Sequence, residues 1–104
     1  MALHQSSGQV TANGSTNFVI CNGFVTLSAH LASGTGTWTW EFMGPDNQWR
    51  SIYGGTDGTT EQAFTGSHMV NAYFGNDVRV RGTASSSSSP EWNWQIISNP
   101  RNRV

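Results

Sequence analysis

The sequence contains no lysine and a single cysteine, and it is poor in charged residues of either sign. Five arginines, three aspartates and three glutamates are spread over 104 residues, which gives a formal net charge of −1. Domains that bind nucleic acid usually present a strongly basic surface, so we expect no nucleic-acid partner. Cys21 has no second cysteine with which to form a disulfide, and we expect a buried, unreactive thiol there.

Signals for export and for membrane insertion are also missing. The first ten residues, MALHQSSGQV, contain neither a basic region nor an apolar run, unlike a secretory signal peptide. No segment approaches the roughly 20 apolar residues of a membrane-spanning helix. We therefore expect a protein that is made in a cytoplasm, without an N-terminal export signal and without a membrane partner.

The residue patterns of common catalytic and cofactor sites are missing as well. His4, His30 and His68 are far apart in the sequence, and there is no HxH, HExxH or CxxC motif for zinc. No glycine-rich loop opens a helix to hold a phosphate. The six carboxylates are not spaced as a recognisable acid–base pair. We expect no cofactor, no metal and no enzymatic activity.

Small polar residues and tryptophan are abundant instead. Ser, Thr, Asn and Gly make up 45 of the 104 residues, and there are five tryptophans. This composition disfavours helices and favours strands joined by turns. Apolar and polar residues alternate in several segments, which predicts strands at 24–31, 37–43, 77–83 and 91–98.

Turn-forming residues separate these segments. Asn22-Gly23 predicts a hairpin between 17–21 and 24–31, and Gly44-Pro45-Asp46-Asn47 predicts a turn before a return strand at 48–53. The runs ASGTG (32–36) and ASSSSSP (84–90) predict loops.

The spacing of strands and turns predicts an all-β fold. The expected architecture is an antiparallel β-sandwich of about seven or eight short strands, immunoglobulin-like or jelly-roll-like in outline only, because the Cys…Trp…Cys pattern of antibody domains is absent. Residues 1–16 are expected to form a polar arm or a weak first strand, 17–98 the sandwich, and 99–104 a polar tail.

Four of the five tryptophans are predicted to lie in the core. Residues two apart in a strand share a face, so Trp38 and Trp40 point the same way, as do Trp92 and Trp94. Each large aromatic side chain buries ~150–250 Å². At ~25 cal/mol per Å², four of them contribute on the order of 20 kcal/mol of gross burial energy. Net domain stability is only about 5–15 kcal/mol, so the fold cannot leave them exposed.

Trp49 has two interpretations. It directly follows the 44–47 turn and is expected either to close one end of the sandwich or to act as an exposed stacking platform. In the second interpretation Tyr53 adds another aromatic surface, and Arg50 or Asn47 supplies hydrogen bonds.

A family resemblance is carried by residues 24–83. The pattern VTLSAHLASGTGTWTWEFMGPDNQWRSIY, followed by VRVRG, resembles small β-sandwich modules of tailed-bacteriophage virions. The resemblance implies a virion structural protein, assembled in the host cytoplasm. The chain begins with its own Met1 and stops soon after the last expected strand, which is more typical of a capsid decoration (cement) protein than of a fibre module.

That resemblance implies the major capsid protein, or another virion protein, as partner. The arm would then contact the capsid through His4, Gln5 and Val10, and the tail through Arg101 and Arg103, in a chain that also forms dimers or trimers. Two alternatives stay open: a carbohydrate-binding module that uses the Trp49 platform, and a head–tail or tail component.

Overall fold

The computed structural model describes residues 4–54, 60–61 and 63–99, and within these ranges it contains β-strands and no helix. The prediction of an all-β fold is confirmed. One sheet has six strands in the order β1-β8-β3-β4, with β2 also paired to β8 and β7 to β3, and β5 and β6 form a separate pair. The strands are β1 (His4–Val10), β2 (Gly14–Ser15), β3 (Val19–Met43), β4 (Trp49–Ser51), β5 (Tyr53–Gly54), β6 (Thr60–Glu61), β7 (Ala63–Phe64) and β8 (His68–Asn99).

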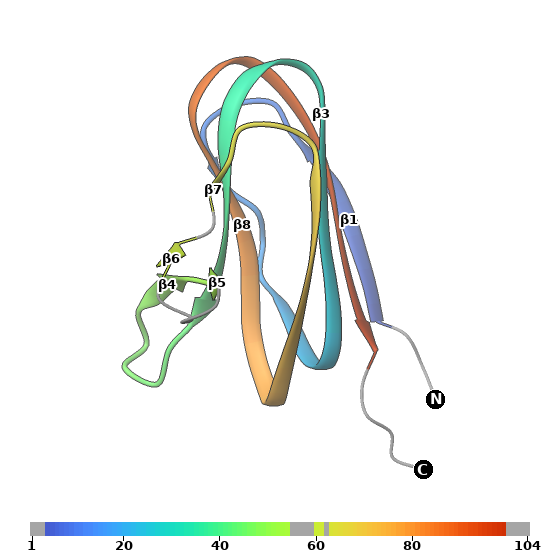
Figure 1. Cartoon of the computed structure of the whole chain (residues 1–104), viewed down its shortest axis with the longest axis vertical. Coiled ribbons are helices and arrows are strands. Elements are labelled where there is room, and N and C mark those ends of the chain that lie inside the picture. The colour runs from blue at the N-terminus through green and yellow to red at the C-terminus, as the bar shows by residue number, and fades with distance from the viewer. Residues whose placement is uncertain (1–3, 55–59, 62, 100–104) are drawn as a thin grey trace.

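β3 and β8 are very long, with 25 and 32 residues. Each doubles back on itself (Figure 1), so no single direction describes their pairing as whole elements. Within each segment the pairing is antiparallel. From residue 24 to 31 of β3 the partners on β8 fall from 99 to 92, and from 37 to 42 they fall from 85 to 80. One pair of strands therefore continues antiparallel around a bend.

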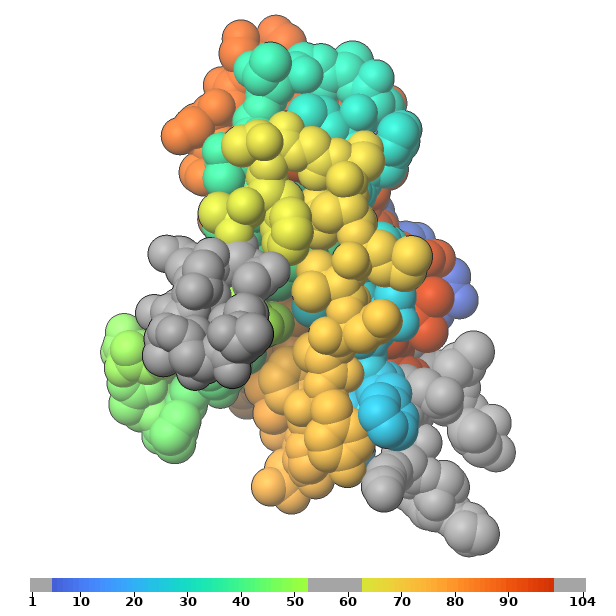
Figure 2. Space-filling view, in the orientation of Figure 1, coloured from blue at the N-terminus to red at the C-terminus, as the bar shows by residue number. Residues whose placement is uncertain are grey.

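The segment 24–31 is sandwiched between two segments of β8. Residues 24–29 pair with 68–73 on one side and with 94–99 on the other. β1 then pairs with 92–98 on their far side. Four segments thus lie side by side, and β1 and 68–74 form the two edges. In Figure 2 the 68–74 segment (yellow) lies on the surface that faces the viewer.

The remaining pairings extend the sheet around the segment 37–42. It pairs with 80–85, while β4 pairs with 41–43 and β7 with 38–39. β2 pairs with 83–84, and residues 19–21 pair with 78–80.

Three expectations about turns are wrong. The runs 32–36 and 84–90 are not loops that separate strands, because β3 and β8 continue through them as a bent pair. No hairpin forms at Asn22-Gly23 either. β3 continues through these residues, and Gly23 adopts a left-handed φ of 76°. The residue of β8 that pairs with β3 changes from Val78, opposite Cys21, to Phe74, opposite Gly23. In each case the turn-forming residues bend a strand pair without ending it.

The turn at 44–47 has the expected form. The amide of Asn47 donates to the carbonyl of Gly44 at 3.0 Å, and the amide of Gly44 donates to the carbonyl of Gln48 at 2.9 Å. Asn47 takes a left-handed φ of 62°, which Asn tolerates better than most residues. The turn leads directly into β4 at Trp49.

The core is built around the four predicted tryptophans. Trp38, Trp40 and Trp92 are at most 1% exposed, and Trp94 is 8% exposed. Trp38 contacts both of its deep neighbours, with ring centroids 5.3 Å from Trp40 and 5.2 Å from Trp92. The prediction that these four side chains form the core is confirmed. Other buried apolar side chains complete the cluster: Cys21, Val25, Leu27, Ala29, Val80, Ala84 and Ile96.

Glycines provide the space that the tryptophans occupy. A Cβ at Gly82 would lie 2.2 Å from Cζ2 of Trp38, far inside van der Waals contact. A Cβ at Gly8 would lie 3.1 Å from the Trp94 ring, so β1 passes close over that indole. A bulky tryptophan on one strand therefore packs against a glycine, which has no side chain, on a neighbouring strand.

Candidate functional site

One outward surface of the sheet carries no Asp, Glu, Lys or Arg, although Glu91 borders it and accepts a hydrogen bond from Nε2 of Gln9 at 3.1 Å. It lies on β1, on 24–30 of β3, and on the 69–73 and 93–97 segments of β8. There the outward residues alternate with the buried ones. We call this surface the uncharged face, and its residues are Gln5, Ser7, Gln9, Phe24, Thr26, Ser28, His30, Met69, Asn71, Tyr73, Asn93, Gln95 and Ile97.

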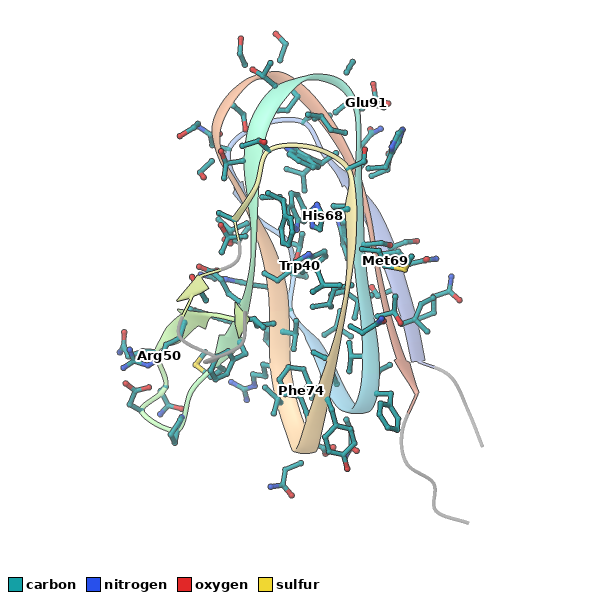
Figure 3. The ribbon with its side chains drawn as sticks, viewed as in Figure 1. Trp40, Arg50, His68, Met69, Phe74 and Glu91 are labelled. Atoms are coloured by element: carbon teal, nitrogen blue, oxygen red, sulfur yellow. The ribbon has the colours of Figure 1, made fainter. Side chains whose placement is uncertain are left out.

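Large apolar side chains are exposed on the uncharged face. Phe24 is 63% exposed, Met69 69% and Tyr73 51%. Phe24 and Tyr73 are cross-strand partners, and their ring centroids are 5.0 Å apart. Figure 3 shows the Met69 side chain pointing away from the interior, on the side opposite to the labelled His68 and Trp40. Exposed apolar area grouped in this way is typical of a surface that binds a partner.

Amide and hydroxyl groups between these apolar side chains are held by hydrogen bonds. The hydroxyl of Thr26 donates to Oδ1 of Asn71 at 3.0 Å. Nε2 of Gln9 donates to Oδ1 of Asn93 at 3.1 Å. Nδ1 of His30 lies 2.8 Å from Oγ of Ser67. The face is therefore a fixed array of uncharged polar groups with an apolar edge.

A second feature is a cluster of arginine and aromatic side chains, which comprises Phe18, Glu41, Trp49, Arg79 and Arg81. Cζ of Arg81 lies 4.2 Å from the ring centroid of Trp49. The rings of Phe18 and Trp49 are 6.5 Å apart and tilted by 43°. We call this the arginine–aromatic cluster.

The cluster changes the interpretation of Trp49. The side chain is half-buried, neither a bare platform nor a core residue, because Arg81 covers its ring. Arg50 pairs instead with Asp46 in the preceding turn, and Figure 3 shows it on the β4 hairpin, away from the interior. The Arg50 guanidinium beside Asp46 holds the pKa of that exposed carboxyl below its usual value. Asn47 is exposed in the same turn, and the Tyr53 side chain lies outside the part that the structure describes.

The expected partner-contact residues are placed as follows. β1 is a strand paired to the end of β8, and Gln5 lies on the uncharged face. Val10 is half-buried and packs against the core. The backbone of His4 pairs with Ser98, and its side chain, like the whole of Arg101 and Arg103, lies outside the described residues.

His68 is a half-buried structural residue that the sequence did not single out. Its Nε2 accepts a hydrogen bond from Nε1 of Trp40 at 2.9 Å, and its Nδ1 lies 2.9 Å from the Gly66 carbonyl. The ring is therefore neutral, with the proton on Nδ1 donated to Gly66. It stacks on Phe64 at 3.8 Å. Burial lowers the pKa of His68 below its usual 6.5.

The chemistry available elsewhere is limited. Burial raises the pKa of the Cys21 thiol to about 11, so the protonated thiol is the stable form. Within the described ranges, no group of three or more His, Cys, Asp or Glu side chains is placed to hold a metal ion. No helix long and apolar enough to cross a membrane occurs in that part of the chain.

Comparison with known proteins adds no relative. No family model matches the chain, and no curated protein matches it.

Proposed function

We propose that this protein is a non-enzymatic virion structural protein that docks onto other virion proteins through the uncharged face. The observation that carries the proposal is the exposure of Phe24, Met69 and Tyr73 on a surface without charged side chains. The resemblance of residues 24–83 to virion modules supports the more specific role of a decoration protein on the outside of a phage head. The major capsid protein is then the partner.

The finer fold assignment belongs to the same proposal. The inward residues of 25–29, 38–40 and 92–96 meet in one tryptophan-rich cluster. A strand pair that bends around such a cluster supports the description of the fold as a β-sandwich. β3 and β8 each contribute more than one paired segment to the sheet. The expected seven or eight short strands are therefore to be compared with these paired segments and not with β3 and β8 as whole elements.

The energetics favour attachment to a repetitive lattice. Full burial of an apolar side chain of this size contributes about 1.5–3 kcal/mol, and stable interfaces bury roughly 800 Å² on each partner. Three exposed apolar side chains therefore support a modest affinity for each contact. A chain that forms dimers or trimers on a capsid gains further affinity from simultaneous contacts.

Binding to purified expanded capsids tests the proposal. Wild-type protein should bind saturably, with copies on the order of hundreds per head, whereas a tail or head–tail ring would hold roughly a dozen. Met69→Ser with Tyr73→Ser should weaken binding at least about tenfold through loss of apolar contact. Ala32→Ser with Ala63→Ser is the control, because both residues are exposed and lie outside the uncharged face. Absence of wild-type binding, or equal loss in the control, contradicts the proposal.

These substitutions are a sharper test than deletion of residues 1–16. β1 packs Gly8 against Trp94, so its removal uncovers the core as well as any capsid contact.

A carbohydrate-binding function is the second candidate, and one observation moves it to a new place. Arg81 covers the Trp49 ring, whereas Tyr73 is exposed beside Asn71 and Thr26 on the uncharged face. A glycan array with wild type, Tyr73→Ala and Trp49→Ala separates the two locations. Signal lost only with Tyr73→Ala supports a glycan site on this face, and no signal with wild type rejects a glycan function.

A further inference from the structure

The arginine–aromatic cluster contains two cation–π contacts side by side. Cζ of Arg79 lies 5.0 Å from the ring centroid of Phe18, and Arg81 is held over the neighbouring Trp49 ring. Significant cation–π contacts occur roughly once per 70–80 residues. Two of them adjoin here, because the Phe18 and Trp49 rings lie 6.5 Å apart.

The two arginines differ in their counter-charges. Nε of Arg81 donates to Oε1 of Glu41 at 2.7 Å, and the same oxygen accepts a hydrogen bond from Thr83 at 2.8 Å. Arg79 forms no ion pair with a carboxylate in the described part of the chain, and Asp77 instead accepts from Nδ2 of Asn22 at 2.7 Å. Within the cluster two guanidinium groups therefore share one carboxylate, and the exposed Arg79 guanidinium is the one that Glu41 does not pair.

We propose that this cluster binds a carboxylate of an acidic segment in a partner protein. The planar guanidinium group of arginine matches a carboxylate with two parallel hydrogen bonds. Its contact with the Phe18 ring restricts the Arg79 side chain, which reduces the entropy lost when a ligand binds.

The surroundings of Arg79 favour a protein ligand over a sugar. Phe18 is 48% exposed, and Ile20, the cross-strand partner of Arg79, is 52% exposed, so apolar surface adjoins the Arg79 guanidinium. Arginine beside aromatic and aliphatic side chains is the composition of a protein interface. A sugar would need an open aromatic face, and Arg81 already covers Trp49. This inference does not rest on the proposed capsid role, since the cluster and the uncharged face share no residue.

The test is a titration of the full ¹⁵N-labelled chain with the peptide acetyl-Glu₄-amide in 150 mM NaCl. Saturable shifts are expected at the indole N–H of Trp49 and at the Nε–H groups of Arg79 and Arg81. The uncharged peptide acetyl-Gln₄-amide should leave these signals in place. Arg79→Gln should weaken binding about fivefold, the upper range for a partly exposed ion pair.

Arg50→Gln is the matched control. It removes the same charge next to Trp49 in the chain, but from a side chain that pairs with Asp46. It should leave the affinity for acetyl-Glu₄-amide nearly unchanged, because the Arg50 guanidinium is already paired with the Asp46 carboxylate. Spectra of both variants report whether the fold is kept. Equal weakening by the two variants, or shifts outside the cluster, overturns the proposal. Tighter binding of a sulfated tetrasaccharide at the same signals would also overturn it and assign a glycan ligand.

Discussion

Replacement of Gly82 by alanine is the most direct test of how the core is packed. The added Cβ would lie 2.2 Å from Cζ2, 2.6 Å from Cε2 and 2.8 Å from Nε1 of Trp38. Trp38 is fully buried between Trp40 and Trp92, so the indole has no open space into which to move. The strand must therefore shift, or the ring must leave its preferred rotamer.

The size of the effect follows from two opposing terms. Overpacking of a well-filled core costs about 1–3 kcal/mol. Replacing Gly by Ala gains about 0.4–1 kcal/mol, because it restricts the unfolded chain. We expect Gly82→Ala to lower the free energy of unfolding by about 1–2 kcal/mol, which is a fall in Tm of roughly 4–16 °C for a domain of this length.

Thermal and urea unfolding measure this change against a matched control. A Cβ at Gly75 would meet nothing within 4 Å, so Gly75→Ala should be neutral or slightly stabilising. Adding Trp38→Phe, which removes the clashing part of the ring, should cost less in the Gly82→Ala background than in wild type. If Gly82→Ala is as stable as Gly75→Ala, the close approach of this strand to Trp38 is wrong.

Two further predictions concern titratable groups, the half-buried His68 and the buried Cys21. The lowered pKa of His68 means that the unfolded chain binds more protons just below pH 6.5. Its contribution to stability is therefore present above pH 6.5 and lost as pH falls through the lowered pKa. Urea unfolding at pH 7.5 and pH 5 should show this loss, and His68→Gln should reduce it; an unchanged slope would contradict the buried neutral ring. Cys21, with its pKa raised to about 11, should react with a disulfide reagent at pH 8 only as fast as the protein opens. Rapid reaction of the native protein would contradict this burial.

The sequence predicts the parts of the fold that depend on local alternation. Trp38, Trp40, Trp92 and Trp94 alternate with polar residues at the period of a strand, and burial of that much apolar area leaves one arrangement. The continuity of β3 and β8 was not predictable in this way. Runs of Gly and Ser have the same local backbone preferences in a loop that ends a strand and in a bend within a continuous strand pair. The sequence of such a run therefore does not distinguish the two.

The candidate sites were less predictable, because they combine residues distant in the sequence. Trp49 was identified as unusual, but its neighbours Phe18 and Arg81 lie 31 and 32 residues away along the chain. The alternation in DVRVRGT placed Arg79 and Arg81 outward, yet only cross-strand register shows what each guanidinium covers. The uncharged face likewise required the register of four segments.

The pairing of β1 with the end of β8 has a consequence for the order of folding during synthesis. His4 pairs with Ser98, and Val10 pairs with Trp92, so β1 cannot find its partner until residues 92–98 have left the ribosome. Contacts this distant in sequence form slowly. β1 is therefore made well before the segment that it pairs with, and its edge must wait for this partner while residues 11–91 are translated.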